Sequence, residues 1–190
     1  MSRRAIFLDR DGTLIRDRHF LRRPEELEFL PGVSEALTLF AKTGLALIVL
    51  SNQSGVARGL FGLNDVVAVN QELERQLAEH GIQLDAIYFC PHHPGGKVEE
   101  FRKRCDCRKP APGMALKASQ ELDLELNGSW IVGDKPDDVR MSEHLPLRPV
   151  LVRTGYGREN EDALKDYPQL KVTDDLLGAA HWILHKEGIS

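Results

Sequence analysis

The sequence predicts an α/β protein with a doubly wound, Rossmann-like parallel sheet. Short apolar runs of strand length alternate with stretches of helical periodicity. Several of these runs end abruptly in acidic, hydroxyl or amide residues, as strands do when their carboxyl ends carry a site. A chain of 190 residues with 42% apolar and 28% charged residues also suits one compact fold. We therefore expect a single domain over residues 1–190.

Composition excludes some classes of protein. The net charge of -4 argues against a protein that binds nucleic acid or a membrane surface. No apolar run approaches twenty residues, and the first apolar stretch is too short for a signal peptide. We expect a cytoplasmic monomer that acts on a small molecule.

The first predicted strand, residues 5–8, ends in Asp9 and Asp11, followed by Gly12 and Thr13. Extended residues two apart point the same way, so both carboxylates should reach one crevice. Such a pair can hold a divalent cation or divide the work of nucleophile and general acid. A simple Asp-Gly turn is the alternative. The following polar, basic loop can lean over the same strand end, or it can be a solvated loop; its candidate residues are Asp17, Arg18, His19 and Phe20.

A second strand is predicted over residues 45–50, after a helix whose apolar stripe runs from Val33 to Phe40. It leads into Ser51, Asn52, Gln53 and Ser54. A hydroxyl and free N–H groups at a strand end can hold phosphoryl oxygens, although an ordinary polar turn looks the same. Next come a helix that Asn64 would cap, with Val66, Val69, Leu73 and Leu77 on one face, and a strand over residues 86–89.

The loop over residues 90–109 holds two halves with metal-ligand spacing. Cys90 and His92 form one half, and Cys105 and Cys107 form the other. Together they make a complete tetrahedral Cys₃His set that suits a structural Zn²⁺, with His93 as a possible replacement for His92. Free cysteines around a turn are the alternative. Arg108 and Lys109 follow directly, either as phosphate ligands or as a surface basic pair.

The remaining chain supplies a helix after Pro112, with Met114, Ala118 and Leu122 on one face, and two further strands. The strand over residues 130–132 ends in an acidic cluster that includes Asp134, Lys135, Asp137 and Asp138. Another strand covers residues 150–152, residues 155–157 should form a mobile loop, and a helix face runs from Leu176 to Leu184.

The four strand ends resemble the motifs of the haloacid dehalogenase-like phosphatases, in the same order and over most of the chain. The resemblance implies that Asp9 attacks phosphorus and that Asp11 serves as acid and base. It implies a Mg²⁺ held by Asp9, Asp134 and the Asp11 backbone carbonyl, with Ser51 and Lys109 on the phosphoryl oxygens. Since only about forty residues separate Asp9 from Ser51, no cap domain is expected.

Within that family, the zinc loop and the motifs around it are similar to those of the phosphatases of heptose 1,7-bisphosphate. This implies removal of the C7 phosphate in the ADP-heptose route to lipopolysaccharide. Substrate contacts are then expected from Asp17, Arg18, His19, Phe20, Ser51, Asn52, Gln53, Ser54, Arg108, Lys109 and Lys135. The histidinol-phosphate phosphatases share these motifs, but twelve residues between His92 and Cys105 favour the heptose enzymes.

Two questions stay open. The loop after the first motif carries Arg18, Phe20, Arg22 and Arg23 where the resemblance leads us to expect a more acidic, Tyr-containing sequence, so the preferred anomer is open. A zinc knuckle that binds nucleic acid is an alternative of another class, with cations at Arg102, Lys103, Arg104, Arg108 and Lys109. The acidic charge balance counts against it.

Overall fold

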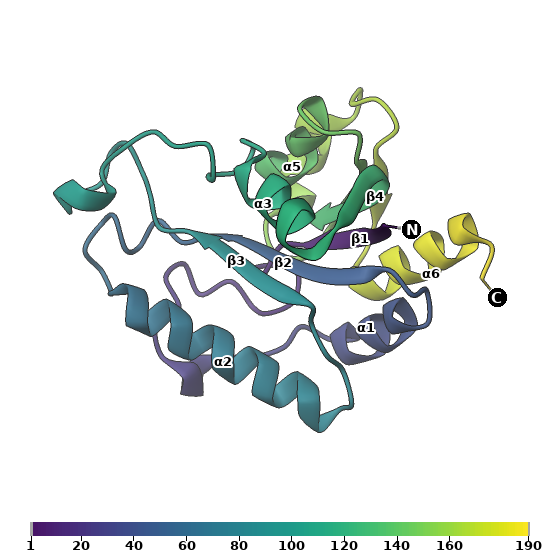
Figure 1. Cartoon of the computed structure of the whole chain (residues 1–190), viewed down its shortest axis with the longest axis horizontal. Coiled ribbons are helices and arrows are strands. Elements are labelled where there is room, and N and C mark those ends of the chain that lie inside the picture. Colours follow the sequence, from purple (N-terminus) through teal and green to yellow (C-terminus); the bar gives the residue numbers. More distant parts are fainter. Residues whose placement is uncertain (1, 190) are drawn as a thin grey trace.

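A six-stranded parallel sheet forms the centre of the protein in a computed structural model that describes residues 2–189 (Figure 1). The spatial order of the strands is β3-β2-β1-β4-β5-β6. From β1 the chain adds strands on one side and then, beginning with β4, on the other. Side chains at the carboxyl ends of β1, β2 and β4 therefore meet where the order reverses. The strands are β1 Arg3–Leu8, β2 Ala46–Asn52, β3 Ala86–Cys90, β4 Leu124–Gly133, β5 Arg148–Val152 and β6 Lys171–Thr173.

Helices cover both faces of the sheet because the strands are apolar on both sides. In β1, Ile6 and Leu8 join the core under α1, α2 and α6, whereas Ala5 and Phe7 join the core under α3. The helices are α1 Val33–Ala41, α2 Leu63–Glu79, α3 Gly113–Leu122, α4 Pro136–Val139, α5 Gly157–Leu164 and α6 Leu176–Glu187. Short 3₁₀ turns lie at η1 Pro24–Glu26, η2 Glu99–Phe101 and η3 Arg140–Glu143.

The predicted fold class is confirmed, and three local predictions need correction. Helix α2 begins at Leu63 after Gly62, so Asn64 is not its cap. Leu122 is exposed at the end of α3 instead of facing the core. Residues 155–157 are not a separate mobile loop, because Gly157 is buried and begins α5. Helix α5 and strand β6 were not predicted at all.

Between Gly12 and Leu45 the structure holds only η1, α1 and connecting loops, so residues 2–189 contain no cap with its own sheet. No helix in this described range combines the length and the hydropathy that crossing a membrane requires.

Candidate active site

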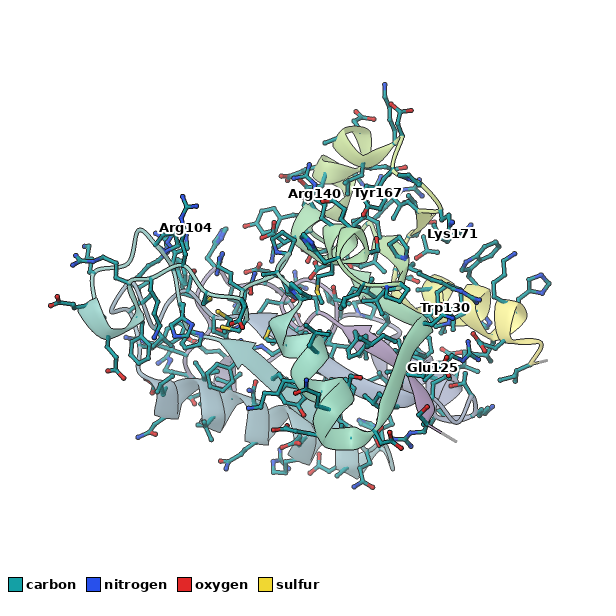
Figure 2. All side chains as sticks on the ribbon, turned by 45° about the horizontal axis from the view of Figure 1, so that its top comes forward. Arg104, Glu125, Trp130, Arg140, Tyr167 and Lys171 are labelled. Atoms are coloured by element: carbon teal, nitrogen blue, oxygen red, sulfur yellow. The ribbon has the colours of Figure 1, made fainter. Side chains whose placement is uncertain are left out.

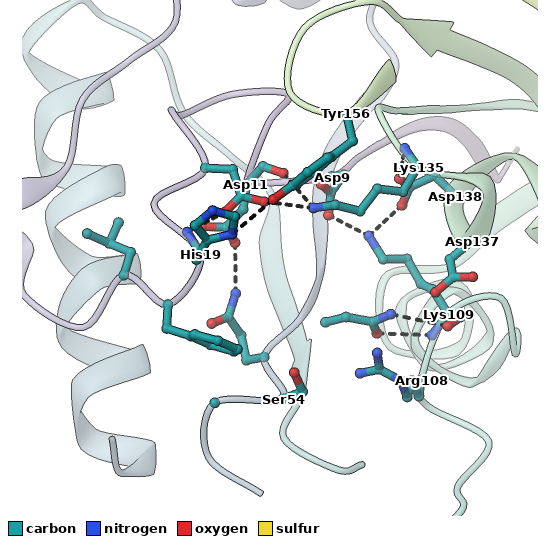
Figure 3. Close-up of a pocket in the computed structure, with 16 residues that line it drawn as sticks. Asp9, Asp11, His19, Ser54, Arg108, Lys109, Lys135, Asp137, Asp138 and Tyr156 are labelled. Atoms are coloured by element: carbon teal, nitrogen blue, oxygen red, sulfur yellow. Dashed lines mark hydrogen bonds and ion pairs between the residues drawn. The ribbon is translucent and has the colours of Figure 1, made fainter. Parts of the chain in front are cut away.

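A cavity of about 240 Å³ opens at the carboxyl ends of β1, β2 and β4 (Figure 3). This is the crevice that the sequence predicted. Its walls come from the two sequence motifs after β1 and β2, the end of the Cys/His loop, and the turns after β4 and β5. The lining residues are Asp9, Asp11, Asp17, His19, Phe20, Leu21, Asn52, Gln53, Ser54, Gly55, Arg108, Lys109, Lys135, Asp137, Asp138 and Tyr156.

Lys109 binds the carboxylates at the floor of the cavity. Its buried Nζ lies 2.6 Å from Asp9 Oδ1, 2.6 Å from Asp138 Oδ1 and 2.6 Å from the Leu50 carbonyl oxygen. The Asn52 side chain fixes the Lys109 backbone from both directions, since Asn52 Nδ2 donates to the Lys109 carbonyl and the Lys109 N–H donates to Asn52 Oδ1, each at 3.1 Å. Lys109 is therefore immobile on β2 and neutralises part of a buried acidic cluster.

The two lysines of the cavity set the charge of Asp9. Burial opposes ionisation of Asp9, but the nearby charges of Lys109 and then Lys135 outweigh it, so the pKa of Asp9 lies below its ordinary value. The negative charge of Asp134 is compensated less completely by nearby cations. Burial and then the negative charge of Asp9 raise the pKa of Asp134 to about 8. The carboxylates at the cavity floor therefore favour the binding of one more positive charge.

The carboxylates of Asp9, Asp134 and Asp138 fit a divalent cation. Each offers an oxygen within 4.8 Å of the others. Within residues 2–189, Asp9 Oδ2 and Asp134 Oδ1 are buried without a hydrogen-bond partner, while Asp138 Oδ1 is paired with Lys109. Hard oxygen ligands of this kind suit Mg²⁺.

Lys135 lies beside these free oxygens. Its Nζ donates to the Asp11 backbone carbonyl at 3.2 Å and lies 3.8 Å from Asp134 Oδ1. The carbonyl that the resemblance assigns to Mg²⁺ therefore accepts a hydrogen bond from Lys135 in this structure. Glycines allow the backbone to come this close to Asp134: Gly12 and Gly155 both have positive φ, and a Cβ at either would collide with the Asp134 carboxylate.

The Asp11 side chain points away from the three clustered carboxylates. Gln53 Nε2 donates to Asp11 Oδ2 at 2.8 Å and also to Ser51 Oγ at 2.7 Å. Ser51 Oγ lies 3.4 Å from the same Asp11 oxygen. Ser51 is buried behind the Gln53 amide and does not line the cavity.

Contacts between three loops, those that follow β1, β4 and β5, close the rim of the cavity. Lys135 Nζ lies 3.0 Å from Asp17 Oδ2 and over the Tyr156 ring, at 5.2 Å from its centroid. The Tyr156 hydroxyl lies 2.9 Å from His19 Nδ1, and Figure 3 shows these two side chains facing each other. Of the four residues predicted in the first loop, Arg18 is not brought to the cavity, because it pairs with Glu28 on the surface.

The predicted site residues did not include the lining residues Leu21, Gly55, Asp137, Asp138 and Tyr156, of which Asp138 and Tyr156 contact the cavity floor. Asp138 was seen only as part of an acidic cluster, although its place two residues after the Pro136 start of α4 turns it back to Lys109. Tyr156 was assigned to a mobile loop. Its N–H donates to Asp134 Oδ2 at 2.8 Å, which fixes the loop to the cavity floor. The strand-end acidic cluster was a sequence signal for Asp138, whereas no local signal distinguishes Tyr156 from an ordinary surface residue.

The four predicted zinc ligands form a second cluster. The Sγ atoms of the three cysteines lie 3.1–3.5 Å apart, and His92 Nδ1 lies 3.2 Å from Cys107 Sγ and 3.7 Å from Cys90 Sγ. Zn–S bonds of about 2.3 Å place sulfurs about 3.8 Å apart in a tetrahedron, so the cluster is slightly tighter than a Zn²⁺ site. These residues can accept Zn²⁺ after a small expansion.

The second histidine does not belong to this cluster. His93 Nδ1 accepts a hydrogen bond from Gly95 N–H, and His93 Nε2 lies 3.4 Å from the Arg58 guanidinium.

Burial raises the pKa of the Cys90 thiol above its usual range, so a thiolate there needs a cation. Burial also lowers the pKa of His92, which keeps the ring neutral and able to bind metal.

Comparisons with known proteins identify the family of this chain. A family model for HAD-hydrolase-like proteins matches residues 106–179. D-glycero-β-D-manno-heptose-1,7-bisphosphate 7-phosphatase of Escherichia coli K12 is 41% identical over 182 residues, which are 95% of this chain and 88% of that protein. The Yersinia pestis protein of the same name is 43% identical over 152 residues, 80% and 81% of the two chains. This chain belongs to the heptose-1,7-bisphosphate phosphatase family of haloacid dehalogenase-like proteins.

A solved structure of the heptose bisphosphate phosphatase family supports the same conclusion. D,D-heptose 1,7-bisphosphate phosphatase from B. bronchiseptica, complexed with magnesium and phosphate, superposes with a TM-score of 0.86 at 34% identity and covers 96% of this chain and 99% of that one. Membership of the heptose bisphosphate phosphatase family makes the chain an enzyme, a phosphoric monoester hydrolase.

Proposed function

We propose that this enzyme removes the C7 phosphate of D-glycero-β-D-manno-heptose 1,7-bisphosphate in a Mg²⁺-dependent reaction. The observation that carries the proposal is the buried cluster of Asp9, Asp134, Asp138 and Lys109 in a chain 41% identical to a phosphatase of that name. The solved relative that binds magnesium and phosphate supports the choice of cation. We choose the β anomer because the names of the relatives specify it.

The residues of the chain divide the reaction between them. Asp9 attacks phosphorus in line, a new O–P bond forms, and the bond from phosphorus to the C7 oxygen breaks. Asp11 gives its proton to that departing oxygen. Asp11 then takes a proton from the water that attacks the aspartyl-phosphate, and phosphate leaves with Asp9 restored.

Charge in the cavity prepares this attack. Lys109 keeps Asp9 ionised, and Lys109 and Ser51 are proposed to hold the phosphoryl oxygens. Bound to Asp9, Asp134 and the Asp11 carbonyl, Mg²⁺ would offset the repulsion between a carboxylate and a phosphate.

Groups at the rim are proposed to recognise the sugar and its second phosphate. Asp17, His19 and Ser54 offer polar atoms at the mouth, while Arg108 and Lys135 offer cations. Arg108 is the strongest candidate for the second phosphate, because the structure pairs it with no carboxylate in the described range and a guanidinium fork binds two phosphate oxygens at once.

The proposal places the enzyme in the ADP-heptose route to lipopolysaccharide, in the cytoplasm. A reducing compartment suits the three free cysteines, which must stay reduced to bind zinc. Zinc is proposed to be structural and separate from the catalytic magnesium, because a complete Cys₃His set leaves no position open for water.

Phosphate release by the purified protein tests the proposed function. The kcat/KM should be highest for the β anomer of heptose 1,7-bisphosphate, compared with the α anomer, fructose 1,6-bisphosphate and histidinol phosphate. Activity should require Mg²⁺ and should be absent in Asp9→Asn. A higher kcat/KM for histidinol phosphate would show that the loop-length argument is wrong. Phosphate release without magnesium would contradict the proposed chemistry.

A further inference from the structure

Arg10 is a fully buried charge beside the catalytic carboxylates, and the mechanism above gives it no role. It stands between Asp9 and Asp11 in the sequence and is 0% exposed, which makes it the largest fully buried side chain of the described residues. A guanidinium does not lose its proton in a protein, so the buried charge must be compensated by its neighbours. In the part of the chain that the structure describes, Asp11 is its one carboxylate partner.

Contacts on two sides hold the Arg10 guanidinium in place. Nε donates to Asp11 Oδ2 at 3.0 Å and Nη2 donates to Asp11 Oδ1 at 3.2 Å, a two-point contact that fixes the plane of the carboxylate. Nη1 donates to Asn70 Oδ1 at 2.7 Å. Asn70 lies in α2 and is only 7% exposed, and its neighbours Val69 and Leu73 pack into the core. The hydrophobic core thus holds α2 in place, and Asn70 of α2 in turn holds the Arg10 guanidinium.

The two oxygens of Asp11 are not equivalent in this arrangement. Oδ2 is approached by three donors, namely Arg10 Nε, Gln53 Nε2 at 2.8 Å and Ser51 Oγ at 3.4 Å. Oδ1 accepts only the Arg10 Nη2 contact among the residues described. Since each carboxylate oxygen has about two lone-pair directions, Oδ1 keeps one free. The Asp11 side chain is 16% exposed and lines the cavity, so this direction is available to a substrate.

We propose that Arg10, anchored by Asn70, is a positioning residue that orients Asp11 so that Oδ1 exchanges the catalytic proton. The inference rests on the proposed function, in which Asp11 is acid and base. In the first step the Oδ1–H bond breaks and the proton joins the departing sugar oxygen, which keeps the electron pair of its broken bond to phosphorus. In the second step Oδ1 takes a proton from the attacking water.

Asn70→Leu tests the inference without touching Arg10 or Asp11. It removes the acceptor of Arg10 Nη1 in a side chain of similar size, and Gln71→Leu on the exposed side of the same helix is the matched control. With the sugar bisphosphate as substrate, kcat should fall by about 10- to 100-fold, which is the usual loss when a residue that orients a functional side chain is removed. The KM should change by less than about threefold. Gln71→Leu should match the unmodified enzyme.

Leaving-group dependence separates positioning from a general loss of structure. The p-nitrophenolate ion leaves without needing a proton, so its single-turnover release should fall by less than about threefold in Asn70→Leu. Equal losses on both substrates, or no loss on either, would overturn the inference. Arg10→Lys is the second variant should Asn70→Leu fold poorly: it keeps the charge but not the two-point contact, and it should show the same dependence on the leaving group.

Asp11→Asn tells failure of this inference from failure of the proposed function. A nearly inactive Asp11→Asn beside an unaffected Asn70→Leu would reject only the role of Arg10. An Asp11→Asn enzyme with unchanged turnover would reject the acid–base role of Asp11 itself. The inference stands only when Asp11→Asn is inactive and Asn70→Leu loses kcat selectively on the sugar bisphosphate.

Discussion

The cavity and the Cys/His loop hold their charged groups in different ways. In the cavity, the sheet brings the strand-end residues together and Lys109 already neutralises two of the carboxylates. The Cys/His loop, residues 90–109, leaves the sheet after β3 and extends beyond its edge (Figure 1). Figure 2 shows Arg104 pointing outward from this loop. We therefore expect the sheet to hold the cavity residues in place without a metal, and the Cys/His loop to need bound Zn²⁺ for full order.

This difference predicts different consequences of losing each site. A change in the cavity should remove chemistry and leave the fold intact. A change in the Cys/His loop should loosen the loop and weaken substrate binding with less effect on the chemical step. The following predictions test this contrast from the largest expected effect to the smallest.

Asp9→Asn should give the largest loss. The amide cannot act as the nucleophile, so kcat should fall on the order of 10⁴-fold or more, as when a nucleophile is removed from other hydrolases. The midpoint of thermal unfolding should stay within a few degrees because the replacement has the same size. Phosphate release and circular dichroism measure the two quantities, and wild-type turnover in this variant would contradict the assignment.

Cys107→Ser should lose zinc and raise KM for the sugar bisphosphate by about 10-fold or more, because Arg108 then loses its fixed position. Turnover at saturating substrate should change much less. His93→Asn is the matched control, since His93 lies outside the cluster and should keep one bound zinc. Metal analysis with kinetics on both variants checks this. Full affinity in zinc-free protein would show that the loop needs no metal.

Asp134→Asn should alter the pH dependence of stability when magnesium is absent. Burial holds the pKa of Asp134 at about 8, above its ordinary 3.8, so the native state keeps a proton that the unfolded chain releases. The free energy of unfolding should therefore fall as pH rises from about 4 to 8, and the asparagine should remove part of that fall. Urea titrations at pH 5 and pH 8 compare the two proteins. Added Mg²⁺ should stabilise the unmodified protein most at pH 8.

Tyr156→Phe should have the smallest effect. Only the hydroxyl that contacts His19 Nδ1 is lost, while the ring over Lys135 stays. This hydrogen bond is exposed to solvent and is worth at most about 1.5 kcal/mol, so KM for the sugar bisphosphate should rise by no more than about 10-fold. His19→Ala should produce a similar increase, and the double variant should add little to either. Fully additive effects would show that the two side chains act independently.

Local patterns made much of the fold predictable. Continuous apolar runs that end in Leu8, Leu50 and Val132 lie within β1, β2 and β4, and the two Cys/His halves have metal spacing in the sequence itself. Strand β6 was missed because it has only three residues, and α5 was missed because its sequence is mostly polar. Neither presents the periodic apolar pattern that indicates an element.

The candidate site was less predictable where it depends on tertiary contacts. Asp138 pairs with Lys109 although 29 positions separate them, and Arg10 contacts Asn70 of α2 across 60 positions of sequence. Nothing in the local sequence specifies these pairings. The single-domain, monomeric organisation stays a prediction, which size-exclusion chromatography with light scattering can test.

The sequence separation of the two clusters affects the order in which they can form during folding. Cys90 and Cys107 are 17 positions apart, so the Cys/His loop closes over a short stretch of chain. Asp9 and Lys109 are 100 positions apart, and β1 must also pair with β4 before Asp134 lies next to Asp9. Short-range contacts close sooner than long-range ones. We therefore expect the folding chain to form the proposed zinc site before the nucleophile site is complete, with phosphatase activity among the last properties that it acquires.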